Sequence, residues 1–326
     1  MLVNCIFGLK FFESKNIKII KMKLFLKCLL LFFSLAIFSQ NQPKKKNLFQ
    51  TAGSVIKTSF NTIPSDFVFL GKEVSDDWKK TGYYAAGILG LIATDKITTK
   101  AWQNHVEPNI DYSLPNITPD FLKNTKNEWI NGQNSYLTYP IIGLYIGSLI
   151  GNSEKGQHVG INSFKAIAYS TLITQITLKT IFGRNRPESP LNTTTKGQPF
   201  TNSNWDFFNS RENEIIFSDW KATGMPSMHL TTFFALAKVI QMEYDNYWIP
   251  YGVMSAVFFS NVKGHQHWFS DMVAGAIVGT LIGRSVVRSS WKARGILDRT
   301  KQKKISLNYT PQFSPEFTGL RIVGTF

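Results

Sequence analysis

Apolar residues are grouped along this chain into segments that are separated by turn or capping residues. Most of these segments are long enough for helices, and turn or capping residues at both ends are typical of helix starts and stops. The pattern predicts a series of six helices, over residues 79–98, 135–151, 160–182, 228–244, 246–260 and 268–290.

Two of the expected helices are rich in small residues, within the runs Tyr83–Ala93 and Val273–Gly283. Small residues let helices approach closely, both in membranes and in water-soluble bundles. Most of the uninterrupted apolar runs fall short of the ~18 residues that a membrane span needs. The pattern therefore leaves three arrangements open: a periplasmic bundle, a bundle lying on a membrane, and one partly inserted in it.

The segments before and after the six expected helices do not show the same helical pattern. Residues 40–78 are interpreted as a linker and an irregular N-terminal segment, with one short packed stretch at Phe67–Gly71. In residues 297–326, apolar and polar positions alternate around Tyr309 and again around Ile322, with a proline-rich turn between them. Alternation with a period of two is typical of strands, so we expect a short β-hairpin-like tail.

A long polar insertion over residues 188–225 interrupts the helical series. Connections of this length are usually functional or disordered. Its scattered aromatic residues favour a packed lid; they are Trp205, Phe207, Phe208 and Trp220.

Residues 1–39 have the pattern of a secretory signal peptide. Lys21 and Lys23 precede the apolar run Leu24–Phe38, Ser39 offers a small residue for cleavage, and Met22 is an alternative start. An uncleaved anchor helix is the alternative, although the run is short for a span of ~20 residues. Both cysteines, Cys5 and Cys28, lie in this segment. A chain cleaved near Gln40 would therefore contain neither a disulfide nor a reactive thiol.

The chain is basic, with 36 Lys and Arg against 21 Asp and Glu and a net charge of +15. Such a balance suits an anionic substrate, a membrane surface or nucleic acid, and it also serves solubility alone. The mean hydropathy of −0.09 is low for a protein made mostly of membrane spans.

The first chemically suggestive stretch is Lys179-Thr-Ile-Phe-Gly-Arg-Asn-Arg186-Pro187. Lys179 and Arg186 are seven residues apart, and Pro187 disfavours helical geometry at Arg186, which predicts two cations at a helix end. Arginine can hold phosphate oxygens bidentately, and lysine adds a point charge. The alternative is a basic helix end that only complements the helix dipole.

The second stretch, Pro226-Ser227-Met228-His229, opens an apolar helix. Unpaired backbone N–H groups at a helix start can bind a phosphate. His229, in the first turn, would face the same anion and could protonate a leaving oxygen. The alternative is an ordinary helix start with a surface histidine.

The third stretch carries His267 and Asp271, which at a spacing of four lie on one helical face. A carboxylate that accepts one ring N–H fixes the tautomer and raises the basicity of the other nitrogen, so His267 could act as a nucleophile. The alternative is a zinc site that also includes His265. No further cluster of His, Cys or Glu accompanies these residues, so we expect neither a metal nor another cofactor.

Together, the three stretches resemble the signature of the phosphatidic acid phosphatase type 2 (PAP2) and vanadium haloperoxidase superfamily. The first block matches fully. The second has Met228 where glycine is usual, and the third has Asn261 where arginine is usual. The matching positions are Lys179, Arg186, Pro187, Pro226, Ser227, His229, Ser260, His267 and Asp271.

This resemblance implies an all-α bundle of the PAP2/haloperoxidase type over residues 79–296, with the site at one end. It implies hydrolysis of a phosphomonoester or pyrophosphate through a phosphohistidine, without a metal. His267 would attack phosphorus, Asp271 would orient it, and His229 would protonate the leaving group and later activate water.

Phosphate oxygens would be held by Lys179, Arg186 and the backbone of Ser227 and Met228. Asn261 stands where the family's arginine binds phosphate, and it brings no charge. The cations that could compensate are Lys263, Arg184 and Lys221.

The expected partner is a phosphorylated lipid or a small phosphomonoester at a membrane surface, not nucleic acid. The expected location is the periplasm or cell membrane of a Gram-negative-type envelope. Three alternatives remain open at this point: a vanadate-dependent haloperoxidase, a lipid phosphotransferase, and a degenerate, non-catalytic envelope protein.

Overall fold

The structure is a computed structural model that describes residues 47–125, 129–132, 134–191, 200–209, 222–262 and 266–296, and the backbone of two strands after them. The expected signal peptide lies outside the described residues. So do several residues singled out in the sequence, namely Trp220, Lys221, Lys263, His265 and Phe326.

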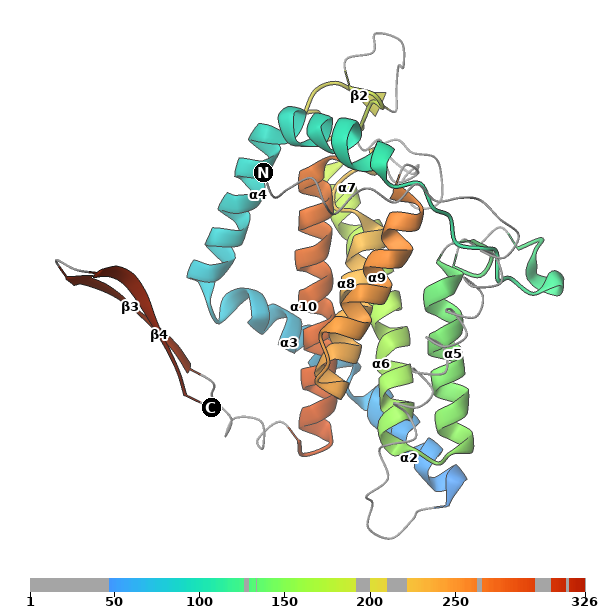
Figure 1. The fold of residues 1–326 in the computed structure, drawn as a ribbon. Coiled ribbons are helices and arrows are strands. Elements are labelled where there is room, and N and C mark those ends of the chain that lie inside the picture. The colour runs from blue at the N-terminus through green and yellow to red at the C-terminus, as the bar shows by residue number, and fades with distance from the viewer. Residues whose placement is uncertain are drawn as a thin grey trace.

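The described chain is predominantly helical, which confirms the predicted fold class (Figure 1). The six predicted helices are all present, and the third begins earlier than expected and changes to π-helical geometry before it ends. They are α4 (Trp78–Ala101), α5 (Ser135–Ile150), α6 with η4 and α7 (Glu154–Ser170, Thr171–Leu178 and Lys179–Phe182), α8 (Met228–Tyr244), α9 (Trp248–Ser260) and α10 (Phe269–Ala293). Shorter helical turns follow α4 at η1 (Trp102–Val106), η2 (Glu107–Asn109) and η3 (Asp120–Leu122).

The prediction of an irregular segment over residues 40–78 is wrong for its described part, which forms α2 (Leu48–Asn61) and α3 (Ile63–Ser75). Asn47 and Gln50 form a capping box at the start of α2. The buried positions of α2 are Thr51, Val55 and Ser59, so its inner face is mostly polar. The helix packs against α6, whereas its large apolar residues Phe49 and Phe60 are exposed.

The centre of the bundle is the contact between α8 and α10. Gly275, Gly279 and Gly283 recur at every fourth position of α10 and face the backbone of α8. A Cβ at Gly275 would lie 2.6 Å from the Ser227 carbonyl oxygen, and at the other two it would overlap the carbonyls of Thr231 and Ala235. The small residues of α10 thus allow the close contact that the sequence predicted.

Within the described residues, α10 is the helix that is long and apolar enough to cross a membrane, judged by length and composition. Most of it is buried inside the bundle, as in the core helix of a globular protein. Helices α5 and α9 are apolar but shorter.

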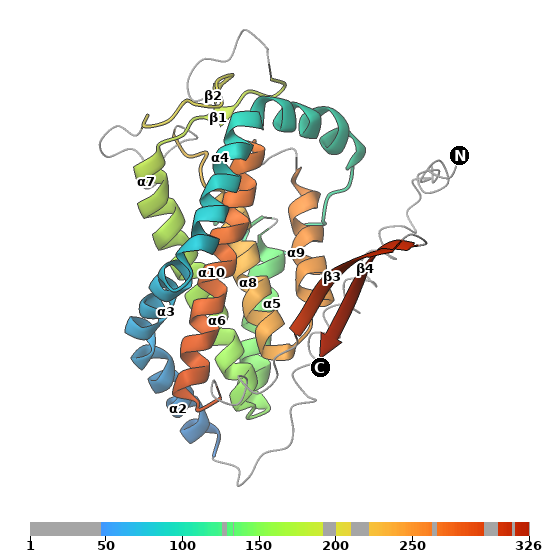
Figure 2. The same ribbon diagram turned by 90° about the vertical axis from the view of Figure 1, so that its left-hand side faces the viewer.

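The C-terminal part contains the predicted pair of strands, β3 (Ser306–Ser314) and β4 (Phe317–Thr325). They are antiparallel, with Tyr309 opposite Ile322, and they stand beside the helices (Figure 2). A second, very short pair joins β1 (Arg186–Pro187) to β2 (Phe200–Thr201) in parallel. Both views place this pair at the same end of the bundle as α7 and the C-terminal half of α4.

Candidate active site

The three sequence stretches meet at one end of the bundle, where α7 ends and α8 and α10 begin (Figure 1). The Gly224 N–H donates to the Arg184 carbonyl at 2.8 Å, and the Ser227 N–H donates to the Asp271 carbonyl at 3.0 Å. The indole N–H of Trp268 donates to the Asn185 carbonyl at 3.0 Å. Each stretch is therefore hydrogen-bonded to another, although they are far apart in the sequence.

Gly224 lies where the three stretches come closest. A Cβ at this position would lie 2.9 Å from the Arg184 carbonyl oxygen and 3.1 Å from Asp271 Oδ2. Any larger residue would push the loop before α8 away from both neighbours. The close approach thus depends on the absence of a side chain.

Lys179 and Arg186 place two cations next to this junction. Lys179 is almost completely buried, and its Nζ donates to Gln175 Oε1 at 2.6 Å. Burial lowers the pKa of Lys179 to about 7, with a further lowering by the charge of Arg186 and an opposing rise from Asp271. Arg186 donates from Nε to Thr223 Oγ1 at 3.2 Å. An anion bound here would favour the charged form of the lysine.

The start of α8 presents Ser227, Met228 and His229. Ser227 is buried, and its Oγ has no hydrogen-bond partner among the residues that the structure describes. The Ser227 side chain does not cap α8, so no side-chain cap occupies the first backbone N–H groups of that helix, which begin with Met228. The ring of His229 stacks on Trp129 with 6.2 Å between centroids, and it meets Phe233 edge-on at 6.2 Å.

The start of α10 holds His267 and Asp271 together. His267 is buried, and its Nδ1 lies 3.6 Å from Oδ2 of Asp271, which is fully buried. That oxygen also accepts the Trp268 N–H at 3.2 Å. Burial raises the pKa of Asp271 to about 6; the Arg184 guanidinium opposes this rise, and the carboxylate of Asp95 adds to it. The separation of 3.6 Å is longer than a hydrogen bond, and it suits an ion pair between Asp271 and a protonated His267.

Residues 163–294 match the family model of the PAP2 superfamily, and this range contains all three stretches. This similarity to the PAP2 superfamily supports phosphatase-type chemistry in general. No curated protein and no solved structure matches the chain.

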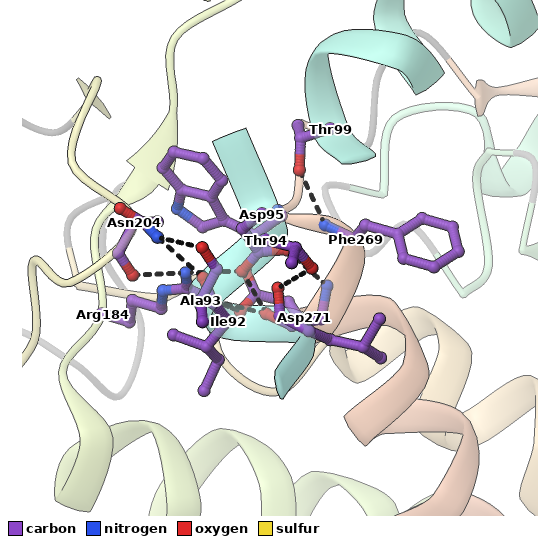
Figure 3. A network of polar contacts seen from close by, with 12 residues as sticks. Ile92, Ala93, Thr94, Asp95, Thr99, Arg184, Asn204, Phe269 and Asp271 are labelled. Carbon is purple, nitrogen blue, oxygen red and sulfur yellow. Dashed lines mark hydrogen bonds and ion pairs between the residues drawn. The ribbon is translucent and has the colours of Figure 1, made fainter. Parts of the chain in front are cut away.

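The matched range also contains a fully buried arginine, Arg184, which the sequence offered only as a possible substitute for the missing phosphate-binding arginine (Figure 3). The guanidinium of Arg184 lies over the rings of Phe207 and Trp268, at 4.8 and 5.0 Å from their centroids. Its Nη1 donates to Asp271 Oδ1 at 2.7 Å, and its Nη2 donates to Asp95 Oδ2 at 2.7 Å. Asp95 lies on α4, before the matched range, and its only sequence signal is a single acidic residue inside an apolar helix.

The position of Asn261 is the main departure from the family signature. It is the exposed C-cap residue of α9, and its N–H donates to the Phe258 carbonyl at 3.2 Å. Arg184 is an unsuitable replacement for the missing arginine because both of its Nη groups are bonded to protein acceptors. Lys263 and Lys221, the other two candidates, lie outside the described residues.

The alternative metal site cannot be assembled from the described part of the chain. No three His, Cys, Asp or Glu side chains are grouped there for a metal ion. His265, which that alternative requires, lies outside the described residues. Of the remaining histidines, His158 is buried near the start of α6, where burial lowers its pKa to about 3, and His105 is exposed on η1.

Proposed function

We propose that this protein is a metal-independent phosphatase that hydrolyses a phosphomonoester or pyrophosphate through a phosphohistidine intermediate. The observation that carries the proposal is the buried pair of His267 and Asp271 beside Lys179. A nucleophile with its orienting carboxylate and a nearby buried cation are the components that phosphoryl transfer to histidine requires.

In the proposed reaction, Asp271 accepts the Nδ1–H of His267, which leaves the Nε2 lone pair free to attack phosphorus. The bond between phosphorus and the leaving oxygen breaks, and His229 donates a proton to that oxygen. His229 then takes a proton from water as the water attacks the phosphohistidine, which releases phosphate and restores His267. Lys179 and Arg186, with the N–H groups at the start of α8, stabilise the charge on the phosphoryl oxygens.

We further propose that the substrate is a lipid phosphate at the surface of an envelope membrane. Exposed apolar side chains lie within the first stretch and after it: Ile181 is 55% exposed, Trp205 56% and Phe208 77%. The N–H of Phe208 donates to the Phe182 carbonyl at 2.8 Å, which holds this aromatic residue beside the end of α7. Exposed aromatic side chains near a phosphate site suit an amphipathic substrate, and the net charge of +15 suits an anionic surface.

The test is phosphate release by the purified protein from phosphatidic acid in vesicles and from a soluble aryl phosphate. We expect activity in EDTA and inhibition by vanadate, because vanadate can mimic the five-coordinate transition state. Activity that is lost in EDTA and restored by zinc would contradict the proposal. Transfer to an added alcohol would instead identify a phosphotransferase, and halide oxidation after vanadate loading a haloperoxidase.

A separate substitution tests whether the substrate is a lipid. Phe208→Ser should raise KM for phosphatidic acid in vesicles several-fold and leave the soluble aryl phosphate unchanged, since only the lipid reaches the exposed ring. Ile150→Ser is the matched control, because Ile150 is 76% exposed at the end of α5, away from the site. An equal effect of both variants would leave the phosphatase assignment intact and argue against this docking position.

A further inference from the structure

We propose that Asp95 is a positioning residue for catalysis: through Arg184 it fixes the carboxylate of Asp271 and keeps the buried cluster behind His267 net negative. This inference rests on the proposed function, because it assigns a role in activating the nucleophile. Asp95 lies on α4, before the matched PAP2 range.

Arg184 connects the two carboxylates. All three side chains are fully buried, so each charge must be compensated by protein groups. The guanidinium donates from Nη1 to Asp271 Oδ1 and from Nη2 to Asp95 Oδ2, both at 2.7 Å. The Asn204 carbonyl accepts a second bond from Nη2 at 2.6 Å. Arg184 thereby holds Asp271 by its Oδ1 (Figure 3). The other oxygen, Oδ2, accepts the Trp268 N–H and lies 3.6 Å from His267 Nδ1.

Asp95 also fixes the backbone that carries the nucleophile. Its Oδ1 accepts the Ser270 N–H at 2.9 Å, and its Oδ2 accepts the Ser270 hydroxyl. One turn further along α4, Thr99 Oγ1 accepts the Phe269 N–H at 3.0 Å. Helix α4 therefore caps the first turn of α10, which begins two residues after His267.

The charges explain why a second carboxylate is useful here. Asp271 paired with Arg184 alone would be neutral overall, and its attraction for the imidazole proton would be weakened. Asp95 balances the guanidinium, so the three groups together carry one negative charge. That charge favours the imidazolium form that His267 takes on when it bonds to phosphorus.

The test compares Asp95→Asn with Thr99→Val. Asparagine keeps the shape of the side chain and an acceptor for the Ser270 N–H but removes the charge, whereas valine removes a cap from the same helix end without altering any charge. We expect Asp95→Asn to lower kcat about tenfold, in the range for partners that orient a functional group from outside the site. KM should change by less than about twofold, and Thr99→Val should leave both constants unchanged within that range.

The pH profile gives a readout that capping alone would not affect. The charged and titratable groups around Asp271 are Arg184 and Lys179 from the first stretch, Asp95 from α4, and the adjacent His267. Removing the negative charge of Asp95 lowers the pKa of Asp271, so the acid-side limb of kcat should move to lower pH in Asp95→Asn. It should not move in Thr99→Val.

A third readout does not require turnover. In ¹⁵N-histidine-labelled protein, the Nδ1 proton of His267 should resonate downfield, and it should move upfield in Asp95→Asn but not in Thr99→Val. If the wild type releases no phosphate from any substrate while this shift appears, the proposed function fails, and only the electrostatic coupling of Asp95 to the His267–Asp271 pair stands.

Equal behaviour of the two variants in an active enzyme would overturn the positioning role and leave the phosphatase assignment intact. If thermal melts show that Asp95→Asn does not fold, Arg184→Lys tests the same connection, since an ammonium group cannot reproduce the fork that bridges two carboxylates. It should then show the same loss of kcat, and wild-type kcat in a folded Arg184→Lys variant would overturn the proposal.

Discussion

Helices α4 and α10 resemble each other in sequence, since both are long and contain a run of small residues, but they contribute differently to the molecule. The glycine face of α10 is in contact with the backbone of α8, whereas a Cβ added at Gly87 or Gly90 of α4 would meet nothing within 4 Å. The polar residues of α4 make its important contacts, because Asp95 and Thr99 reach the first turn of α10. A run of small residues thus permits close packing but does not by itself predict it.

The segment that leads into α10 is expected to be the most sensitive part of the molecule. His267→Ala should reduce phosphate release by about 10³-fold or more, because the covalent path is lost with the nucleophile. The matched control after α4 is His105→Ala, which should retain activity because His105 is exposed on η1. Circular dichroism should show an unchanged helix content for both. Retained activity in a folded His267→Ala variant would refute the assignment of the nucleophile.

The pH dependence should reflect Asp271 on α10 and Lys179 on α7. Asp271, with its pKa raised to about 6 by burial, must be ionised, so activity rises as the pH increases through that value. Lys179, with its pKa lowered to about 7 by burial, must be protonated, so kcat/KM falls above that value. We therefore expect a bell-shaped profile of kcat/KM with its maximum between the two.

Lys179→Arg separates the two limbs of that profile. Arginine stays charged, so the alkaline limb should move upward while the acid limb stays in place. An alkaline limb that is unchanged in this variant would show that another group is responsible for it.

Asn261 tests the segment that leads into α10. If the phosphate site lacks one positive charge, Asn261→Arg should raise kcat/KM for a generic phosphomonoester by roughly one to two decades, the value of a charge-assisted hydrogen bond of ~1.5–3 kcal/mol made in the transition state. If Lys263 already fills that place, the new arginine should crowd it and lower activity, and Lys263→Ala should be strongly damaging. No change in either variant would place this segment outside the phosphate site.

The helices and the three motif blocks were predictable because their signals are local. Continuous apolar runs mark α5, α8 and α9, and the motif spacing depends only on positions along the chain. Helices α2 and α3 were missed although apolar residues recur at helical spacing in both segments. The structure buries several polar residues there, such as Thr51 and Asp66, and leaves apolar ones such as Phe60 exposed.

The connection from Asp95 to Arg184 could not be predicted for a different reason. The two residues are 89 positions apart, and no sequence pattern around either of them indicates that they form an ion pair. Only packing of α4 across the start of α10 brings them together. The stacking of Trp129 on His229 is equally non-local, since it joins the connection before α5 to the first turn of α8.

The contrast between the two glycine faces predicts opposite effects on stability. Gly279→Ala on α10 places a Cβ into the Thr231 carbonyl oxygen, so α8 and α10 must move apart. Overpacking of this kind costs about 1–3 kcal/mol of the free energy of unfolding. Urea denaturation measures it, and an unchanged midpoint would contradict the backbone contact between the two helices.

Gly90→Ala on α4 is the matched substitution with the smallest expected effect. Gly90 lies in the interior of the helix, is exposed, and has nothing within 4 Å of the added methyl group. Alanine has a higher helix propensity and restricts the unfolded chain more than glycine, so the variant should be more stable by about 0.5–1 kcal/mol, with unchanged phosphate release. The same urea experiment measures the gain as a higher midpoint at an unchanged slope. A loss of stability would mean that the small-residue face of α4 is covered in the folded protein by a second copy of the chain or by another partner, and the difference between α4 and α10 would then disappear.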